Sequence, residues 1–318
     1  MIHCLPIPTP FMVGRVNTYL IEDDPLTLVD TGPNSGKALD ELEQALAAHG
    51  HRVEDLELIL LTHQHIDHIG LASILARRSG AEVAALDKLA PILQRFAEVN
   101  EADDEFAEAL MLRHGLSPDV AVSLRSVSRA FRAWGGSVEV TRPLTDGGVL
   151  ELRDRRLQVF HRPGHSPTDT IFWDEERSEL IAADHLIKHI SSNPLLTRAL
   201  DGSSERPQAL VTYMDSLRKT REMPAKLVLS GHGDPIDDHV SLIDERFRLH
   251  ERRAKKILGL ITQEPRTAHD IAQELWGNIA VTQAFLTLSE VLGHVDLLIN
   301  AGSVREVDRD GVSVFEAV

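Results

Sequence analysis

The chain has 318 residues, a formal net charge of −16 at pH 7 and 42% hydrophobic residues. This length suffices for one large domain and one small one, and the hydrophobic content is ordinary for a globular protein. The acidic balance argues against a nucleic-acid partner, because phosphate contacts need clustered Lys and Arg. Cys4 is the single cysteine, which excludes an intramolecular disulfide and fits a reducing compartment.

The N-terminal residues Met1 to Pro6 lack a basic segment followed by an apolar one, so we expect no signal peptide. No run approaches the roughly 18 apolar residues that a membrane span needs. Cytoplasm is therefore the expected location, with no membrane partner.

Apolar runs and turn signals predict alternating strands and helices in the first third of the chain. Ser35 is the expected N-cap of an amphipathic helix that runs to His49. The predicted elements are two strands within 16–31, the helix 36–49, a strand 58–61, a short helix 70–79 and a strand 82–85. This alternation implies an α/β layered core.

The stretch Thr62-His63-Gln64-His65-Ile66-Asp67-His68 directly follows the apolar run Leu58 to Leu61. Where the strand ends, His63 and His65 can point one way, while Asp67 and His68 lie beyond the bend and face a second point. Imidazole nitrogen and carboxylate oxygen are ligands that a borderline ion such as Zn²⁺ prefers. The spacing therefore predicts half of a two-metal site rather than a solvated His-rich loop.

Residues 87–134 have helical periodicity, interrupted at Gly115 and Pro118. They could be a helical excursion packed on itself, or a cap over the metal site. We expect the cap, because long insertions in compact enzymes usually form lids or binding elements. Its apolar residues would then suit an acyl or aromatic group of a substrate.

Three later segments each place a potential ligand after an apolar, strand-like run. They are Pro163-Gly164-His165-Ser166-Pro167, Ile181-Ala182-Ala183-Asp184-His185 and Leu229-Ser230-Gly231-His232-Gly233-Asp234-Pro235. Strand ends hold ligands on a rigid scaffold, and glycines let the backbone approach an ion closely.

With these motifs, the chain from about Asn17 to His239 resembles the metallo-β-lactamase superfamily, and Val29-Asp30-Thr31-Gly32 looks like its first motif. The resemblance implies an αββα sandwich and two divalent metal ions. One ion would be held by His63, His65 and His165, the other by Asp67, His68 and His232, with Asp184 bridging them. Zn²⁺ is the expected ion, although this ligand set also takes iron or manganese.

Residues 241–318 differ in character from the domain expected over 1–240. A long helix, about 238–262, precedes helical stretches at 266–275 and 280–301 and two strands, 304–307 and 312–315. Three helices and a hairpin in this order predict a winged helix. A winged helix after this core resembles the β-lactamase-like endoribonucleases and related thioesterases of polyketide pathways.

The helix that would read DNA, 280–301, contains no Lys or Arg, and Glu290 and Asp296 would repel phosphates. From Ser241 onward, nine Lys and Arg stand against twelve Asp and Glu. We therefore expect this module to pack against the core or a second subunit, as in a homodimer.

The expected reaction is hydrolysis of an acyl bond in a small molecule, a thioester or a lactone, by a metal-bridged hydroxide. Two metals can lower the pKa of a shared water and stabilise the departing anion. Asp67 and His185 are the candidate catalytic side chains, with His185 donating to an oxyanion or only supporting a ligand. Phosphodiester hydrolysis of single-stranded RNA is one alternative, and an iron-binding sensor or redox protein without hydrolysis is another.

Overall fold

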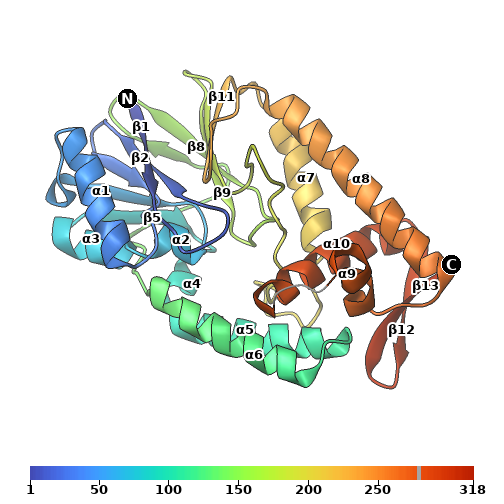
Figure 1. Ribbon diagram of the computed structural model, residues 1–318. Coiled ribbons are helices and arrows are strands. Elements are labelled where there is room, and N and C mark those ends of the chain that lie inside the picture. Colours follow the sequence, from blue (N-terminus) through green and yellow to red (C-terminus); the bar gives the residue numbers. More distant parts are fainter. Residues whose placement is uncertain (278–280) are drawn as a thin grey trace. The chain divides into compact units, whose positions relative to one another are not determined.

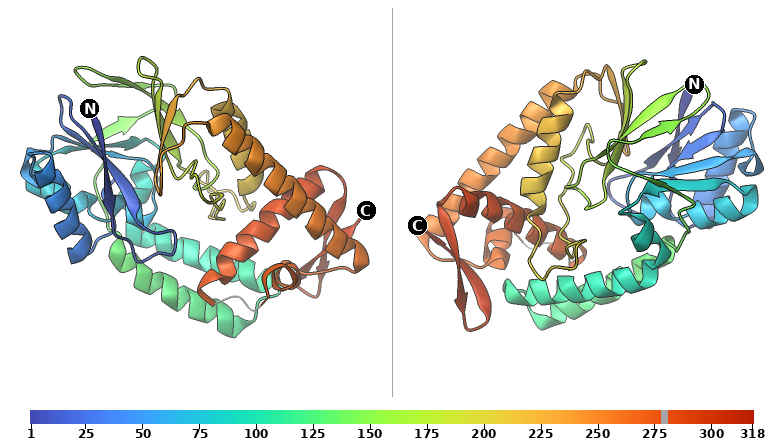
Figure 2. Two further views of the ribbon diagram at one scale, coloured as in Figure 1. Left: turned by 45° about the horizontal axis from the view of Figure 1, so that its top comes forward. Right: turned by 180° about the vertical axis from the view of Figure 1, so that it is seen from behind.

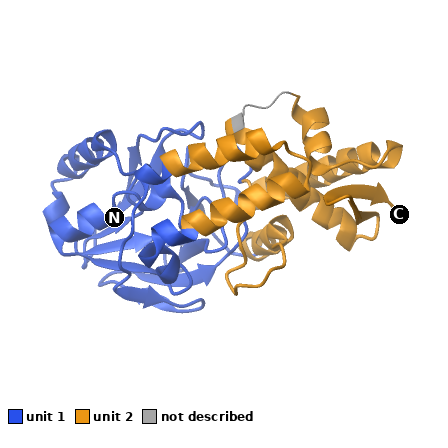
Figure 3. Cartoon of the chain, turned by 90° about the horizontal axis from the view of Figure 1, so that it is seen from below, with its two compact units in different colours: residues 1–99, 131–192, 222–239 blue, residues 100–130, 193–221, 240–318 orange. Residues whose placement is uncertain are grey.

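The computed structural model describes residues 1–277 and 281–318. The chain divides into two compact units, which Figure 3 colours separately. Unit 1 consists of Met1–Val99, Phe131–Ser192 and Glu222–His239, and unit 2 of Asn100–Ala130, Asn193–Arg221 and Val240–Val318. The expected C-terminal module, 241–318, thus lies in a unit that also contains two earlier segments of the chain.

A six-stranded sheet forms the first half of unit 1. Its strands, in spatial order, are β1 (Ile2–Ile7), β2 (Val16–Ile21), β3 (Thr27–Val29), β4 (Leu58–Leu61), β5 (Glu82–Leu86) and β6 (Arg142–Leu144). β1 to β3 pair antiparallel, whereas β3 to β6 pair parallel. The carboxyl ends of β3, β4 and β5 therefore lie at one edge, which confirms the strands expected there.

A five-stranded sheet forms the second half of unit 1. Its strands are β7 (Val149–Glu151), β8 (Arg156–His161), β9 (Thr170–Asp174), β10 (Glu179–Ala183) and β11 (Leu227–Ser230), in the spatial order β11-β10-β9-β8-β7. β8 and β10 both run antiparallel to β9, and β11 runs parallel to β10. The carboxyl ends of β8, β10 and β11 consequently share one edge.

The two sheets of unit 1 pack face to face through side chains that alternate along the strands. Leu58 and Leu60 of β4 join a buried cluster with Phe172 of β9, while Ile59 and Leu61 face a cluster on the opposite side. Helices line that opposite side in Figures 1 and 2: α1 (Gly36–Ala48), α3 (Ala72–Ser79) and α4 (Ala90–Gln94). The α/β layered core is confirmed.

A side-chain cap fixes where the first long helix of unit 1 begins, and short helical elements complete the unit. The Ser35 side chain accepts a hydrogen bond from the Ala38 amide, which confirms it as the N-cap of α1. The short elements are η1 (Val53–Asp55), α2 (Ile66–Ile69) and η2 (Arg132–Trp134).

Unit 2 is helical with one hairpin. Its elements are α5 (Phe96–Arg113, which begins in unit 1), α6 (Pro118–Phe131, whose last residue is in unit 1), α7 (Ala209–Arg221), α8 (His239–Gln263, whose first residue is in unit 1), α9 (Ala268–Trp276), η3 (Val281–Gln283), α10 (Ala284–Asn300), β12 (Val304–Arg309) and β13 (Val312–Ala317). Thr267 caps α9 in a reciprocal capping box with Asp270. The expected helices and hairpin are confirmed in order, although residue 280 lies outside the described residues.

Several apolar residues of the 87–134 segment contribute to the buried cores of the two units, and the cap expected from this segment stays a prediction. Leu89 and Leu93 are buried in the unit 1 core against the sheet, and Leu110 and Leu124 are buried in the unit 2 core with residues of α8 to α10. Helical periodicity shows that one face of a helix is buried, but does not identify its partner.

Among the described residues, no helix is both long and apolar enough for a transbilayer segment.

Candidate metal centre

The predicted ligands of unit 1 all follow the carboxyl ends of strands. His63 and His65 come after β4 of the six-stranded sheet, and Asp67 and His68 lie in α2 just beyond them. His165, Asp184 and His232 follow β8, β10 and β11, whose ends share one edge of the five-stranded sheet. Both sheets therefore deliver side chains to one place.

Three imidazoles converge in a first group. Nδ1 of His65 lies 3.1 Å from Nε2 of His63 and 2.9 Å from Nε2 of His165. Ligand nitrogens around a tetrahedral Zn²⁺ stand about 3.3 Å apart, because each Zn–N bond is about 2.0 Å long. The three nitrogens are thus spaced closely enough to share one ion.

A second group surrounds the Asp184 carboxylate. Its Oδ1 lies 3.4 Å from Nε2 of His68, while its Oδ2 lies 3.5 Å from Nε2 of both His165 and His232. Asp67 Oδ2 is 3.4 Å from Nε2 of His232. Asp184 therefore touches members of both groups, as a bridging ligand would.

The structure brings together all seven residues predicted as ligands. Among the described residues of unit 1, the sets able to hold an ion are His63 with His65 and His165, His63 with His68 and Asp184, and Asp67 with His68 and His232. His185 is buried beside Asp184 in the chain but belongs to none of these sets.

The second nitrogen of several imidazoles is fixed by a polar partner. Nδ1 of His63 lies 2.9 Å from the Thr62 hydroxyl oxygen, and Nδ1 of His68 lies 2.7 Å from Oδ2 of Asp30. Nδ1 of His232 donates to the Arg15 carbonyl at 2.8 Å. Such partners fix the tautomer and orientation of a metal-ligating histidine and raise its basicity.

The site fits a metal ion because buried ligand atoms lack other partners. Nε2 of His68, Nε2 of His232 and Oδ1 of Asp184 have no hydrogen-bond partner within the described residues. A buried polar atom without a partner costs about 1–3 kcal/mol. A divalent ion would satisfy all three atoms at once. The sequence motif gives the residue types but not these unpaired atoms.

Two backbone positions that place Asp30 and Asp184 are locally strained: Asp30 itself and Ala183, which precedes Asp184. Asp30 and Ala183 adopt positive φ angles of 56° and 44°, in the left-handed region that non-glycine residues avoid. Such residues cost about 1–3 kcal/mol each and occur mainly at functional sites. Gly231 is required beside them, because a Cβ there would stand 2.0 Å from Oδ1 of Asp184.

Burial and close charges shift the pKa values of the centre in opposite directions. Burial lowers the pKa of His63 well below its usual value and that of His65 to about 3. For His232, burial also favours the neutral form, but the charge of Asp184 and hydrogen bonds to Asp184 and Asp67 together outweigh burial and raise the pKa to about 9. Burial opposes ionisation of Asp184, yet the charges of His68 and His232 hold its pKa well below its usual value.

Sequence reasoning gave no role to two buried acids near the centre. Asp30 belongs to the motif Val29 to Gly32, and its position directly after a buried strand was the available signal. Asp169 accepts a hydrogen bond from the Ser166 amide at 3.0 Å, and burial raises its pKa to about 6. No ligand spacing in the sequence points to Asp169, because its hydrogen bond to Ser166 forms within a turn that follows His165.

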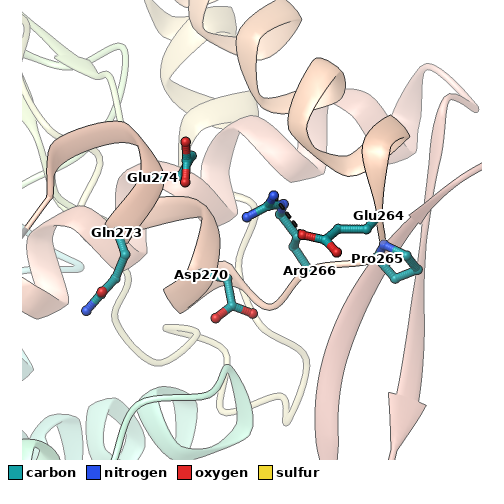
Figure 4. Close-up of a pocket in the computed structure, with 6 residues that line it drawn as sticks. All are labelled: Glu264, Pro265, Arg266, Asp270, Gln273 and Glu274. Atoms are coloured by element: carbon teal, nitrogen blue, oxygen red, sulfur yellow. Dashed lines mark ion pairs between the residues drawn. The ribbon is translucent and has the colours of Figure 1, made fainter.

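Unit 2 contains an open pocket of a different kind, shown in Figure 4. Its volume is about 550 Å³, and it is lined by Glu264, Pro265, Arg266, Asp270, Gln273 and Glu274. Arg266 pairs with Glu264 at 2.8 Å. Such a polar lining lacks the imidazoles that distinguish the centre in unit 1.

Comparison with known proteins agrees with this geometry. Residues 12–232 match the model of the Metallo-beta-lactamase superfamily, and the chain belongs to this family. It is 31% identical over 293 residues to "Probable metallo-hydrolase YqjP" of Bacillus subtilis (strain 168), covering 92% of this chain and 90% of that protein. Family membership and the buried His and Asp side chains together define a metal-dependent hydrolase.

Two further relatives extend the comparison. A crystal structure of a metallo-beta-lactamase family protein from Thermus thermophilus has a TM-score of 0.83 and 28% identity, covering 100% of this chain and 98% of that one. The "Atrochrysone carboxyl ACP thioesterase" of Aspergillus fumigatus is 23% identical over 283 residues, 88% of this chain and 69% of that protein.

Proposed function

We propose that the protein hydrolyses an acyl bond, a thioester or a lactone, with two divalent ions bound in unit 1. The observation that carries this proposal is the position of Asp184, whose two oxygens face His68 on one side and His165 and His232 on the other. A carboxylate placed in this way can bind two ions at once, and paired ions are a recurrent device for hydrolysis.

The proposed ligand sets follow the two groups. His63, His65 and His165 would hold one ion, Asp67, His68 and His232 would hold the other, and Asp184 would contribute to both. Nitrogen donors with carboxylates favour Zn²⁺, and iron or manganese are the alternatives. When bound, the ions supply Lewis acidity toward a carbonyl oxygen and lower the pKa of water.

The protein's own side chains orient these groups. Asp30 and the Arg15 carbonyl fix the rings of His68 and His232, so that Nε2 of each points toward the carboxylates. Burial first, and then Arg162, lowers the pKa of His185 to about 3, so its ring is neutral at pH 7. A neutral imidazole can donate a hydrogen bond to a developing oxyanion, which is the role proposed for His185.

An acyl substrate is favoured over a polynucleotide by charge and by one relative. A net charge of −16 opposes the approach of a polyanion. A relative that covers 88% of this chain is named as a thioesterase of acyl carrier protein. The substrate is therefore proposed to be a small acyl compound rather than RNA.

The C-terminal elements are proposed to form a winged helix with a structural role. α8, α9 and α10 precede the hairpin β12–β13, whose strands pair antiparallel from Val304–Ala317 to Arg309–Val312. Residues 288 to 296 of α10 are all buried. A helix buried along this length is poorly suited to enter a DNA groove.

A panel of thioesters, lactones and single-stranded RNA, assayed on the zinc-reconstituted full chain, tests the proposal. We expect kcat/KM to be highest for an acyl substrate. His63→Ala should lower it by more than about 100-fold, since loss of a mere supporting residue already costs 10–100-fold. His49→Ala is the control, because the ring of His49 packs against that of His3 and His49 is not among the candidate ligands.

Faster cleavage of RNA than of every thioester and lactone, abolished by His63→Ala, would show that the acyl proposal is wrong. Absence of hydrolysis of every thioester and lactone by protein with both ions bound would also contradict the acyl proposal.

A further inference from the structure

Unit 2 contains a second cluster of metal-binding side chains, separate from the centre in unit 1. It consists of His250 on α8 and of Glu290 and His294 on α10. Glu290 and His294 are four residues apart, so they lie on the same face of the helix, one turn from each other. His250 and His294 are 1% and 0% exposed, and Glu290 is 9% exposed.

The hydrogen bond of His294 fixes its tautomer. Nδ1 of His294 lies 2.7 Å from the backbone oxygen of Glu290. A carbonyl oxygen only accepts, so Nδ1 carries the proton and Nε2 keeps its lone pair. A backbone carbonyl is one of the usual partners that orient a metal-ligating histidine.

Nε2 of His294 points at a second imidazole rather than at solvent. It lies 3.1 Å from Nδ1 of His250, close to the roughly 3.3 Å between neighbouring ligand atoms of a tetrahedral zinc site. Candidate ligand atoms of His250, Glu290 and His294 all lie within 4.8 Å of one another. Because Nε2 of His294 has no proton, Nδ1 of His250 donates the hydrogen bond between the two rings, and an ion that contacts all three side chains must displace that proton.

We propose that His250, Glu290 and His294 bind a further divalent cation of the borderline class, with Zn²⁺ the preferred ion. Two imidazoles and one carboxylate are a zinc ligand set, and water would complete four-coordination. Because His250 lies on α8 and the other two ligands lie on α10, at least 40 residues later in the chain, the ion would link these two helices. The site does not depend on the proposed hydrolysis, since none of its ligands belongs to the centre of unit 1.

Arg253 lies against one of the three proposed ligands. Its guanidinium pairs with Oε1 of Glu290 and lies 5.6 Å from the ring centre of Trp276. A buried carboxylate needs an opposite charge, and Arg253 supplies it. An ion would compete with this guanidinium, so removing the Arg253 charge should strengthen ion binding.

The decisive measurement is Zn²⁺ bound per full-length chain, by elemental analysis after dialysis at a fixed concentration of unbound Zn²⁺. We expect His250→Gln and His294→Gln each to lose one equivalent relative to the unsubstituted chain, and the double variant to lose no more. His114→Gln is the matched control, since His114 is also buried in unit 2 but belongs to no candidate metal group. Equal Zn²⁺ content in all these proteins would overturn the proposal.

Arg253→Gln keeps the proposal testable if the histidine variants fold poorly. Loss of one positive charge beside a dication should lower the Kd of the additional Zn²⁺ by about tenfold or more. Unchanged or weaker Zn²⁺ binding in Arg253→Gln would show that the cluster is only an internal hydrogen-bond network. A lower Kd would support the metal site, because a hydrogen-bond network would not respond in this direction.

Discussion

Nδ1 of His68 lies 2.7 Å from Oδ2 of Asp30, and both side chains are buried. Asp30 also accepts hydrogen bonds from the amide and the hydroxyl of Thr62, at 3.0 Å and 2.8 Å. One carboxylate thus joins the loop after β3 to the loop after β4, which contains the histidine motif. The ring of His68 is consequently held with Nε2 toward Asp184.

Asp30→Asn should weaken metal binding without removing a metal ligand. An amide is a weaker acceptor than a carboxylate, so the Kd for Zn²⁺ should rise about 10- to 100-fold, as for other supporting residues of metal sites. Competition with a chelator measures this constant. Asp40→Asn is the control, because Asp40 is exposed and its side chain accepts a hydrogen bond from Gln44, one turn along α1. Equal affinities of the two variants would contradict the role given to Asp30.

Gly231→Ala should abolish the centre through steric conflict alone. A Cβ at residue 231 would stand 2.0 Å from Oδ1 of Asp184, so the carboxylate or the loop must move. We expect Zn²⁺ content to fall by at least one equivalent and hydrolysis to be lost, while circular dichroism remains unchanged. Gly259→Ala is the matched control, since nothing lies within 4 Å of a Cβ there. Alanine should even stabilise α8 by about 1 kcal/mol.

Local chemistry predicted much of the fold and of the site. Ser35 signals the start of α1 because its hydroxyl satisfies an amide of the first turn. Strand ends followed by potential ligands pointed to the segments of the site, because the scaffold is rigid there, and the resemblance to a known family then named the seven candidate ligands. Burial of Leu58 to Leu61 on both faces of the sheet was likewise visible as an unbroken apolar run.

Features that depend on distant partners could not be predicted. The helical stripe containing Leu110 and Leu124 is buried against helices more than 100 residues later, and periodicity does not name the partner. His250 and His294 lie 44 residues apart without any motif spacing, so only the packing of α8 on α10 brings them together. Asp30 likewise gains its role only when β3 and β4 pair.

Metal binding to the centre should strengthen as pH rises toward 9. Burial lowers the pKa of His232, but Asp184 and Asp67 together raise it to about 9, so this imidazole is protonated at pH 7 before an ion binds. An ion must displace that proton, and raising the pH removes the competition. Measured by titration calorimetry in buffers of different ionisation enthalpy, binding should release protons at pH 7 and fewer at pH 9. Proton release that does not change between pH 7 and pH 9 would contradict this assignment.

Without bound ions, the protein should become less stable as the pH rises. A pKa raised on folding means that the charged His232 stabilises the native state. This contribution is complete below the pKa of about 6.5 of an unfolded histidine and disappears as pH rises through about 9. The free energy of unfolding of chelator-treated protein, measured with urea, should therefore fall between pH 6.5 and pH 9. His232→Gln should flatten that decrease, and an unchanged slope would count against it.

Asp184→Ala should distinguish a bridging carboxylate from a ligand of one ion. Its Oδ1 and Oδ2 contact His68 on one side and His165 and His232 on the other, so its loss weakens both proposed ion sites. We expect the binding of both ions to weaken, with hydrolysis lost even where one ion remains. His165→Ala is the comparison, because it should weaken mainly the ion held with His63 and His65. If Asp184→Ala keeps the full Zn²⁺ content and activity, Asp184 is not a bridging ligand, because its two oxygens would then bind neither ion.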